Sequence, residues 1–347
     1  ADRMDLGNAL EEAGVKVVQL PTRHKWNLIG AALNISRLAD QYCIDIIHAH
    51  LYFPAQSTAL VKLLRLSGAA TVVTFHNLAY ANGVNTGGMG LRFKRALASC
   101  LCPKGFDRKI AVSNAVAAHY RSALGLDAID VVHNPVDIEA IDGLNLHRAR
   151  MSDNTMHIVV PGRLVHEKGQ SDLLDALALL QDQGLEFTAS IAGDGPMRSE
   201  LELKTRLAGL EGVVTFTGIL KHRSILEVVA TADIVVIPSR FEGFGLTAIE
   251  AMALSRPVIV TAAGGLVEIV ENGVSGTIVQ AQKPVELARA LRELMSLRVM
   301  REEYGSEGRA RVEREFALPR ITLQMQALYE ETLTLNQEKS TFDANRR

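Results

Sequence analysis

Two basic residues stand in a glycine-bracketed segment that follows an apolar run. The segment begins at Gly162 and ends at Gly169, and it holds Arg163 and Lys168 ahead of a helical pattern. Two cations beside the N-terminus of a helix suit a diphosphate, because the exposed N–H groups and the helix dipole also favour an anion. A solvated loop whose charges bind nothing explains the segment equally well when it is taken alone.

A second glycine-containing turn follows the apolar run 188–192. Glycine lets the backbone come close to a ligand, and proline suits the first position of a helix. A tight connection from strand to helix without any ligand is an equally good interpretation. The residues concerned are Gly193, Gly195 and Pro196.

Two glutamates, Glu242 and Glu250, lie eight positions apart after a later apolar run. The helix that begins between them would favour an anion at its N-terminus. Carboxylates beside an anion site fit neutral hydroxyl groups, so the pattern indicates a sugar nucleotide, which offers ribose, diphosphate and sugar. The alternatives are a helix-terminal charge for Glu250 and a solvated loop charge for Glu242. Between the two lie Gly243, Phe244, Gly245 and Leu246.

Three histidines in the first half of the chain are candidates for chemistry. His76 follows the apolar run 71–75, and an imidazole can donate or accept a hydrogen bond near neutral pH. Side-chain alternation places His48 and His50 on one face of a strand end, where His50 suits a cleft and His48 the core. We expect no metal at these three residues, because no carboxylate or cysteine completes a ligand set. A structural histidine is the alternative for His76.

Short apolar runs alternate with helical patterns along the chain, and this alternation must position the candidate residues. Continuous apolar strands between helices predict parallel sheets covered on both faces, and the polar stretch 134–155 separates two such units. Ligands of these sheets bind beyond the carboxyl ends of the strands. Expected strands are 15–20, 45–48, 71–75, 109–112, 130–132, 158–161, 188–192, 213–217, 234–238, 258–261 and 277–279. Expected helices are 6–13, 28–42, 55–66, 91–101, 114–124, 170–183, 197–207, 225–231, 247–254, 285–294 and 299–335.

Composition excludes several classes of protein. The 347 residues are 48% hydrophobic and 22% charged, which argues against a disordered chain. A net charge of −2 gives no global reason to bind nucleic acid, and the three cysteines cannot form a disulfide framework. The longest apolar run, 258–267, is far shorter than the roughly 20 residues that span a bilayer. We therefore expect a soluble, cytoplasmic protein of two domains.

Three of these segments together resemble a known family. Gly162–Gly169, Gly193–Pro196 and Glu242–Glu250 are similar, in order and spacing, to the retaining glycosyltransferases of family 4 (group 1). The two glutamates with Phe-Gly between them are the most specific element, and the resemblance covers essentially the whole chain. Pro135 stands where family members often have glycine. Further matching segments are His48–His50, Thr74–Asn77, Ala111–Ser113 and His133–Asp137.

The resemblance implies a GT-B fold of two Rossmann-like, doubly wound α/β domains that face each other across a cleft. It also implies transfer of a sugar from a nucleotide-diphosphate sugar to a glycan, lipid-linked or small-molecule acceptor, in cell-surface polysaccharide, lipopolysaccharide or glycoconjugate synthesis. No metal and no other cofactor would take part. By resemblance, Arg163 and Lys168 hold the diphosphate, Glu242 the sugar hydroxyls and Glu250 the ribose. His76 would lie at the reactive centre. Further donor-binding residues would be Gly162, Gly193, Gly195, Pro196, Gly243, Phe244, Gly245 and Leu246, and His50 and Asn77 are acceptor-side candidates.

The same resemblance divides the chain. We expect an acceptor-side domain over 1–150, a donor-binding domain over 151–315, a helix over 316–335 that packs back toward the first domain, and a polar tail over 336–347. Family members usually begin with a strand, a glycine-rich turn and a helix that have no counterpart here. We therefore expect several dozen residues to be absent before residue 1, which puts the activity of this chain in doubt.

Residues 91–109 hold six basic side chains and one acid, interspersed with apolar residues. Contact with the inner face of an anionic membrane is one interpretation, and an ordinary amphipathic helix is the favoured one. Two alternatives to a transferase are a sugar-nucleotide epimerase of the same fold and an inactive module that binds a nucleotide sugar. The basic residues are Arg92, Lys94, Arg95, Lys104, Arg108 and Lys109.

Overall fold

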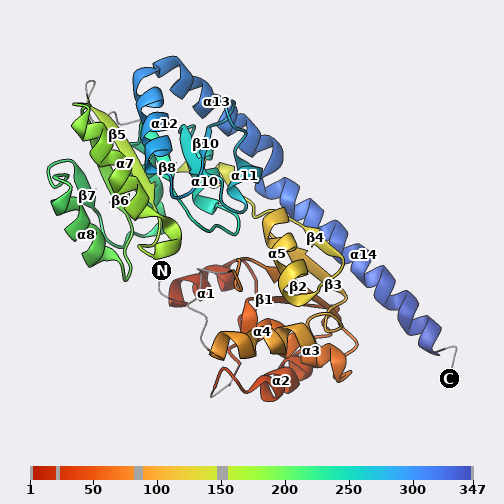
Figure 1. The fold of residues 1–347 in the computed structure, drawn as a ribbon. Coiled ribbons are helices and arrows are strands. Elements are labelled where there is room, and N and C mark those ends of the chain that lie inside the picture. Colours follow the sequence, from red (N-terminus) through yellow and green to blue (C-terminus); the bar gives the residue numbers. More distant parts are fainter. Residues whose placement is uncertain (1–2, 21–23, 82–88, 147–154, 345–347) are drawn as a thin grey trace.

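The computed structural model describes residues 3–20, 24–81, 89–146 and 155–344. Two parallel β-sheets organise the chain, each in its own α/β domain (Figure 1). The first sheet has the order β1-β2-β3-β4, with strands Ile46–His50, Ala70–Phe75, Arg108–Ala111 and Ile129–Val131. Its helices are α1 (Arg3–Glu12), α2 (Leu28–Gln41), α3 (Tyr52–Leu63), α4 (Met89–Leu101), α5 (Asn114–Leu124) and α6 (Ile138–Gly143).

The second sheet has the order β10-β9-β8-β5-β6-β7. The chain winds outward from β5 in both directions, so a topological switch point lies between the neighbours β5 and β8. Its strands are β5 (Met156–Pro161), β6 (Phe187–Ala192), β7 (Val214–Phe216), β8 (Ile234–Ile237), β9 (Val258–Thr261) and β10 (Thr277–Val279). Its helices are α7 (Gln170–Asp182), α8 (Arg198–Leu207), α9 (His222–Ala230), α10 (Leu246–Ala253), α11 (Leu266–Ile269), α12 (Pro284–Ser296) and α13 (Arg298–Glu315).

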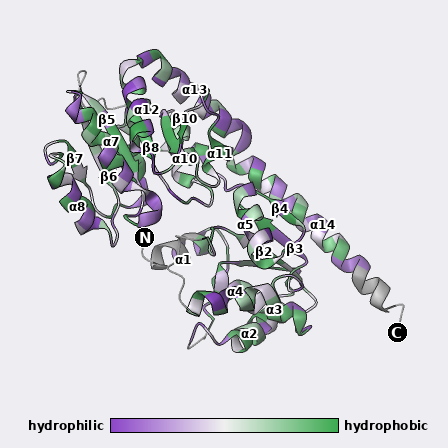
Figure 2. Ribbon diagram, in the orientation of Figure 1, coloured by the Kyte–Doolittle hydropathy of each residue, from purple (hydrophilic) through white to green (hydrophobic). Residues whose placement is uncertain are grey.

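The central strands are buried on both faces. All residues of β2, β8 and β9 are buried, and the strands of both sheets are mostly apolar (Figure 2). This burial explains the continuous apolar runs, because helices cover both faces of a parallel sheet. The predicted fold class, two Rossmann-like α/β domains with parallel sheets, is confirmed. The chain winds in both directions only in the second sheet, because the four described strands of the first sheet follow one another in chain order.

The last helix, α14 (Leu318–Ala344), leaves the second domain and runs along the first (Figure 1). Ile321 at its start is buried with Val72 and Ile110 of the first sheet and with Val132, which follows β4. The connection that leads into α14 also pairs with the one that leaves the first sheet. Val136 donates to the carbonyl of Phe316 at 2.9 Å and accepts from Leu318 at 3.0 Å.

Two expectations about secondary structure are wrong. Residues 15–20 form no strand, and Val15, Val17 and Val18 are 49%, 44% and 44% exposed. A strand needs a hydrogen-bonded neighbour, and in the described part of the chain none of the four strands of the first sheet pairs with this segment. The polar residues after Leu335 continue α14 as far as Ala344, because glutamine, glutamate and lysine are good helix formers and no proline interrupts them.

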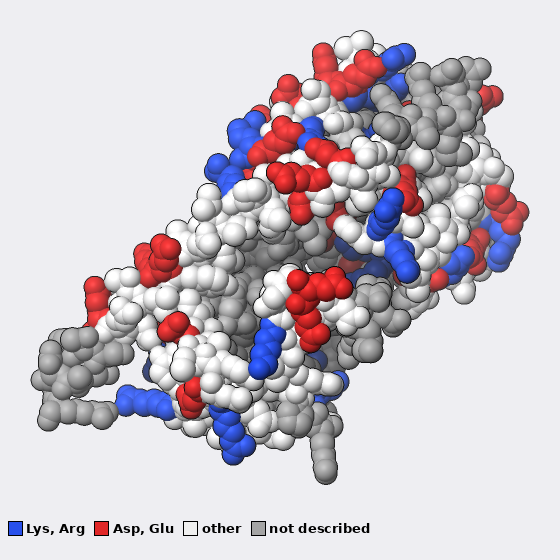
Figure 3. Space-filling model, turned by 180° about the vertical axis from the view of Figure 1, so that it is seen from behind, with Lys and Arg blue, Asp and Glu red and all other residues white. Residues whose placement is uncertain are grey.

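Charged side chains are spread over the surface. On the face drawn in Figure 3, basic and acidic side chains are interspersed, so no field of one sign covers it. Of the helices described here, none combines the length and the apolar character that a bilayer crossing requires.

Candidate active site

The loops that follow β5 and β8 meet at the switch point, where open parallel sheets bind their ligands. They line a cavity of about 170 Å³ that is closed on its other side by the first domain. The predicted residues Arg163, Lys168, Glu242 and Gly243 all line it, together with Asn77. The remaining lining residues are Leu78, Val165, Glu167 and Phe241.

An ion pair occupies the floor of this cavity. Lys168 Nζ lies 2.6 Å from Glu242 Oε2, which also accepts a hydrogen bond from Ser239 Oγ at 3.1 Å. Arg163 is exposed and has no ion-pair partner among the described residues. The cavity therefore presents one unpaired guanidinium and one ammonium that can exchange its carboxylate for another anion.

Hydrogen bonds of Arg240 hold the loop that carries Glu242. Arg240 donates two hydrogen bonds to Asp172, at 2.8 and 2.6 Å, and its backbone N–H donates to the carbonyl of Glu167 at 2.8 Å. The hydrogen bonds to Asp172 raise the pKa of Arg240. Arg240 is thus a structural cation, and its bidentate pair holds Glu242 and Gly243 in place.

Two glycines permit close backbone contacts. A Cβ on Gly193 would lie 2.0 Å from the carbonyl oxygen of Gly162, so this pair packs one loop on the other and does not line the cavity. A Cβ on Gly243 would lie 2.4 Å from the carbonyl oxygen of His76, in the other domain. Gly195 and Pro196 likewise lie outside the cavity lining. The donor-binding role predicted for these four loop residues (Gly162, Gly193, Gly195 and Pro196) stays a prediction.

Glu250 lies apart from Glu242. It lines a separate cavity of about 320 Å³ with Leu246, between α6, α9 and α10. His222 Nε2 lies 2.8 Å from Glu250 Oε1 in the same cavity. The structure therefore places one glutamate in each of two cavities, which the spacing of eight residues does not reveal.

Phe244 has a buried side chain. Its ring stacks on His133 at 5.5 Å between centroids, and Phe316 packs edge-on to it at 5.9 Å. Gly245 precedes the first residue of α10 as its N-cap. Because the ring of Phe244 is buried, only the backbone groups of Phe244 and Gly245 could contact a ligand. Anion binding at a helix N-terminus uses such backbone N–H groups.

The three histidines form a connected row. His50 Nδ1 lies 2.8 Å from His76 Nε2, and His48 bonds Thr74 Oγ1 at 2.7 Å and the hydroxyl of Tyr329 on α14 at 2.6 Å. Burial, followed by the charges of His50 and His76, lowers the pKa of His48 to about 4, and burial also lowers the pKa of both other rings. All three are therefore neutral near pH 7. In the described parts of the chain, no group of three or more His, Cys, Asp or Glu residues could hold a metal ion.

Glu268 joins the two domains, a role that sequence reasoning missed. Its carboxylate accepts from the backbone N–H groups of Asn114 and Ala115, at 2.9 and 3.0 Å, which are the first two residues of α5. His133 Nε2 lies 3.3 Å away. Burial would raise the pKa of Glu268, but the hydrogen bonds from His133, Asn114 and Ala115 outweigh it and lower the pKa to about 2. The only sequence signal was a carboxylate after a small-residue turn.

Two parallel-sheet domains with a basic loop, a helix N-terminus and a carboxylate at the switch point define a GT-B architecture. Comparison with protein families agrees with it. The family described as "Glycosyltransferase Family 4" matches residues 4–140, and "Glycosyl transferases group 1" matches residues 148–311. The chain belongs to the group 1 glycosyltransferases.

Curated relatives cover different shares of the chain. An α-D-kanosaminyltransferase of Streptomyces kanamyceticus is 30% identical over 52% of this chain, and the match spans 46% of that protein's length. An uncharacterized glycosyltransferase of Methanocaldococcus jannaschii is 28% identical over 92% of this chain and 86% of its own length. The chain thus spans less than half of the first relative and most of the second.

Solved structures share the fold. A protein of Anabaena in complex with UDP has a TM-score of 0.79 at 23% identity and covers 94% of this chain, which covers 89% of it. A glycosyltransferase of Rickettsia africae has a TM-score of 0.77 at 21% identity, with 94% and 88% covered.

Proposed function

We propose that this chain is a retaining glycosyltransferase that takes its sugar from a nucleotide-diphosphate sugar and needs no metal ion. One observation carries the proposal. Arg163, Lys168 and Glu242, from the loops after two adjacent strands, surround one cavity that Asn77 of the other domain closes. The Anabaena structures, of the same fold, were solved with UDP and with UDP-glucose, which supports a donor of this class.

The cationic side chains would stabilise the leaving group. When the bond between the sugar and the diphosphate breaks, negative charge grows on the departing oxygen. Arg163 and Lys168 then provide fixed positive charge in a site partly screened from water, and stabilisation of this kind lowers the activation barrier more than any other effect in many enzymes. Lys168 pairs with Glu242 in this structure, and the diphosphate would replace the carboxylate as the partner of the ammonium group.

The carboxylates would bind the uncharged parts of the donor. Glu242, released in part from Lys168, can accept hydrogen bonds from sugar hydroxyls in the cavity of about 170 Å³. Glu250 in the cavity beyond α10 can accept from ribose hydroxyls, with His222 as its present partner. His76, held by His50, would face the reacting centre.

The test is the release of nucleoside diphosphate from UDP-glucose and GDP-mannose, with and without added acceptor. Lys168→Ala should reduce turnover by roughly 10²- to 10³-fold, the usual effect of losing one charge-stabilising donor. Lys204→Ala is the matched control, because Lys204 is also ion-paired, at 2.7 Å to Asp175, but lies outside both cavities. Undiminished turnover in Lys168→Ala would remove the assignment, and formation of an isomer of the donor would indicate an epimerase.

Cytoplasmic location and membrane contact through residues 91–109 stay predictions. Several basic side chains there are engaged within the chain. Lys94 lies over the ring of Tyr52 at 5.7 Å, Arg95 donates to a backbone carbonyl at 2.9 Å, and Arg108 pairs with a glutamate of α14. These contacts favour an ordinary amphipathic helix. Salt-sensitive co-sedimentation with anionic liposomes would instead support membrane contact.

A further inference from the structure

The side chain of Glu242 uses only one of its two carboxylate oxygens for contacts within the described part of the chain. Lys168 Nζ lies 2.6 Å from Oε2, and Ser239 Oγ donates to the same oxygen at 3.1 Å. Oε1 has no hydrogen-bond partner among the described residues, and it does not belong to the buried polar atoms that lack one. Because Glu242 lines the cavity of about 170 Å³, a ligand in that cavity can reach Oε1.

Ser239 is completely buried just beyond the end of β8. Its carbonyl accepts a hydrogen bond from the hydroxyl of Thr261, the buried last residue of the neighbouring strand β9. Pro238 before it packs on the loop that carries Lys168, since a Cβ on Gly169 would lie 2.0 Å from the carbonyl oxygen of Pro238. Adjacent strands and a close backbone contact therefore fix the position of the Ser239 hydroxyl.

The two partners of Oε2 would respond differently to a bound donor. The ammonium group of Lys168 would take the diphosphate as its new partner. Ser239 is buried and does not line the cavity, so its hydroxyl would stay with Glu242. A hydrogen bond to an ionised carboxylate is also stronger than one between uncharged groups. Ser239 would therefore keep Glu242 in place after Lys168 has changed its partner.

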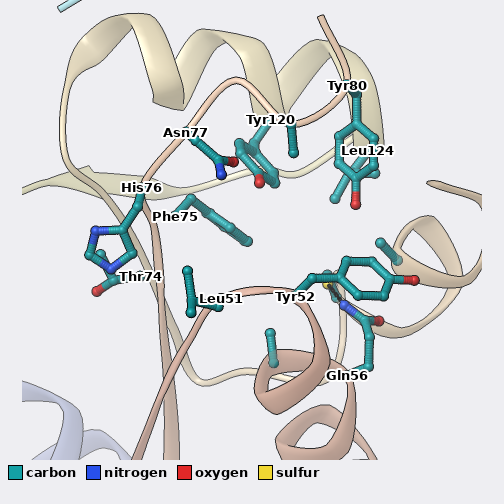
Figure 4. Close-up of a pocket in the computed structure, with 14 residues that line it drawn as sticks. Leu51, Tyr52, Gln56, Thr74, Phe75, His76, Asn77, Tyr80, Tyr120 and Leu124 are labelled. Atoms are coloured by element: carbon teal, nitrogen blue, oxygen red, sulfur yellow. Dashed lines mark hydrogen bonds between the residues drawn. The ribbon is translucent and has the colours of Figure 1, made fainter. Parts of the chain in front are cut away.

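The first domain does not supply a second anchor for this carboxylate. Asn77 and Leu78 line the cavity from that side, and Figure 4 shows Asn77 and His76 on the segment that follows β2. Among the described residues, none of these three forms a hydrogen bond or an ion pair with Glu242. The direction of the carboxylate is therefore determined within the second domain, by Lys168 and Ser239.

We propose that Ser239 is a positioning residue for glycosyl transfer, because its hydroxyl holds Oε2 of Glu242 and thereby directs Oε1 at one hydroxyl group of the transferred sugar. The inference rests on the proposed function and adds a residue to it. With Oε2 engaged inside the protein, Glu242 recognises a single sugar hydroxyl and does not bind two hydroxyls with its two oxygens. Binding of the nucleotide part of the donor does not depend on Ser239.

Binding of a nucleotide with and without its sugar tests the proposal on the full chain. Isothermal titration calorimetry gives the affinities for UDP and UDP-glucose, with GDP and GDP-mannose as a second pair. Ser239→Ala should weaken binding of the nucleotide sugar about tenfold, near the lower end for a hydrogen bond to a charged group, and change binding of the free nucleotide less than about twofold. A general disturbance of the fold would weaken both members of a pair. Equal loss for both, or no loss for either, would overturn the proposal.

Three further variants locate the effect. Ser239→Thr keeps a hydroxyl group and should bind the nucleotide sugar more tightly than Ser239→Ala; equal affinities of the two variants would contradict the proposal. Thr261→Val removes the donor to the Ser239 carbonyl and should weaken the nucleotide sugar selectively but less, which provides a test even where Ser239→Ala does not fold. Ser275→Ala is the matched control, because Ser275 is also buried in the second domain, accepts from the backbone N–H of Glu271 at 2.9 Å, and lies outside both cavities.

Hydrolysis of the donor separates this proposal from the proposed function. At a donor concentration well below KM, Ser239→Ala should release nucleoside diphosphate about tenfold more slowly than the unmodified chain, because the sugar is held less well. Release at the unmodified rate by Ser239→Ala would overturn the role of Ser239 alone. If the unmodified chain binds neither pair of ligands and releases neither nucleotide, the proposed function is contradicted, and the role of Ser239 with it.

Discussion

Neutralising Glu268 tests how firmly the two domains are joined. Its carboxylate accepts two backbone N–H groups at the start of α5 and lies 3.3 Å from His133. A shift of the pKa from 4.5 to about 2 corresponds to about 3 kcal/mol, and we lower this to about 2 kcal/mol because the side chain keeps 15% of its surface exposed. Glu268→Gln should therefore reduce the free energy of unfolding by about 2 kcal/mol at pH 7.

The pH dependence has a defined sign. The folded-state pKa of Glu268 lies below its unfolded value, so the unfolded chain takes up the proton first as the pH falls. The contribution of the ionised Glu268 side chain to the free energy of unfolding is complete above pH 4.5 and is lost as the pH falls toward 2. The difference between the unmodified chain and Glu268→Gln should therefore shrink over this range.

The assay is urea unfolding at several pH values, followed by circular dichroism and by the fluorescence of Trp26, the single tryptophan, which lies in the first domain. Glu227→Gln serves as the control, because Glu227 is exposed and, among the described residues, forms an ion pair with Arg223 alone, one turn away on the same helix. If Glu268→Gln and Glu227→Gln unfold at the same urea concentration at pH 7, the contacts of Glu268 with α5 and His133 do not stabilise the fold, and the prediction is wrong.

Three further outcomes follow from other contacts. Gly243→Ala should cost about 1–3 kcal/mol of stability by overpacking, since its Cβ would lie 2.4 Å from the carbonyl of His76; a melting temperature equal to that of the unmodified chain would contradict this. Tyr329→Phe should cost about 1 kcal/mol through the lost bond to His48, measured by urea unfolding. The His48 pKa of about 4 predicts that stability falls as the pH drops from 6.5 to 4, and that His48→Gln reduces this dependence; an unchanged pH profile would refute it.

The meeting of three candidate residues at one cavity could be predicted, because parallel-sheet geometry determines it. Arg163, Lys168 and Glu242 follow adjacent strands, so their meeting at one edge needs no tertiary knowledge. The sequence could not predict that Glu250 and Glu242 line different cavities, because this depends on the direction in which α10 leaves the loop. Residues 15–20 have the pattern of a strand, but a strand also requires a neighbour with which to bond.

The contacts between the two domains could not be predicted from the sequence. The partners of Glu268 lie more than 130 positions away in the chain, and no local pattern indicates such a pair. Gln56 Oε1 on α3 is buried and has no hydrogen-bond partner among the described residues. The sequence could not reveal this either, since an apolar helical pattern does not show which polar side chain lacks a partner.

The hydrogen bonds between Val136 and the segment around Ala317 have a mechanical consequence. The chain crosses between the domains twice, and the two crossings are fastened side by side at this point. Sliding of one domain along the other would break both crossings together, whereas rotation about them would not. We therefore expect the domains to move relative to each other by a hinge rotation about a single axis through the two crossings. The facing surfaces of the two domains would then keep their spacing near Val136, and they would separate most at the positions farthest from it.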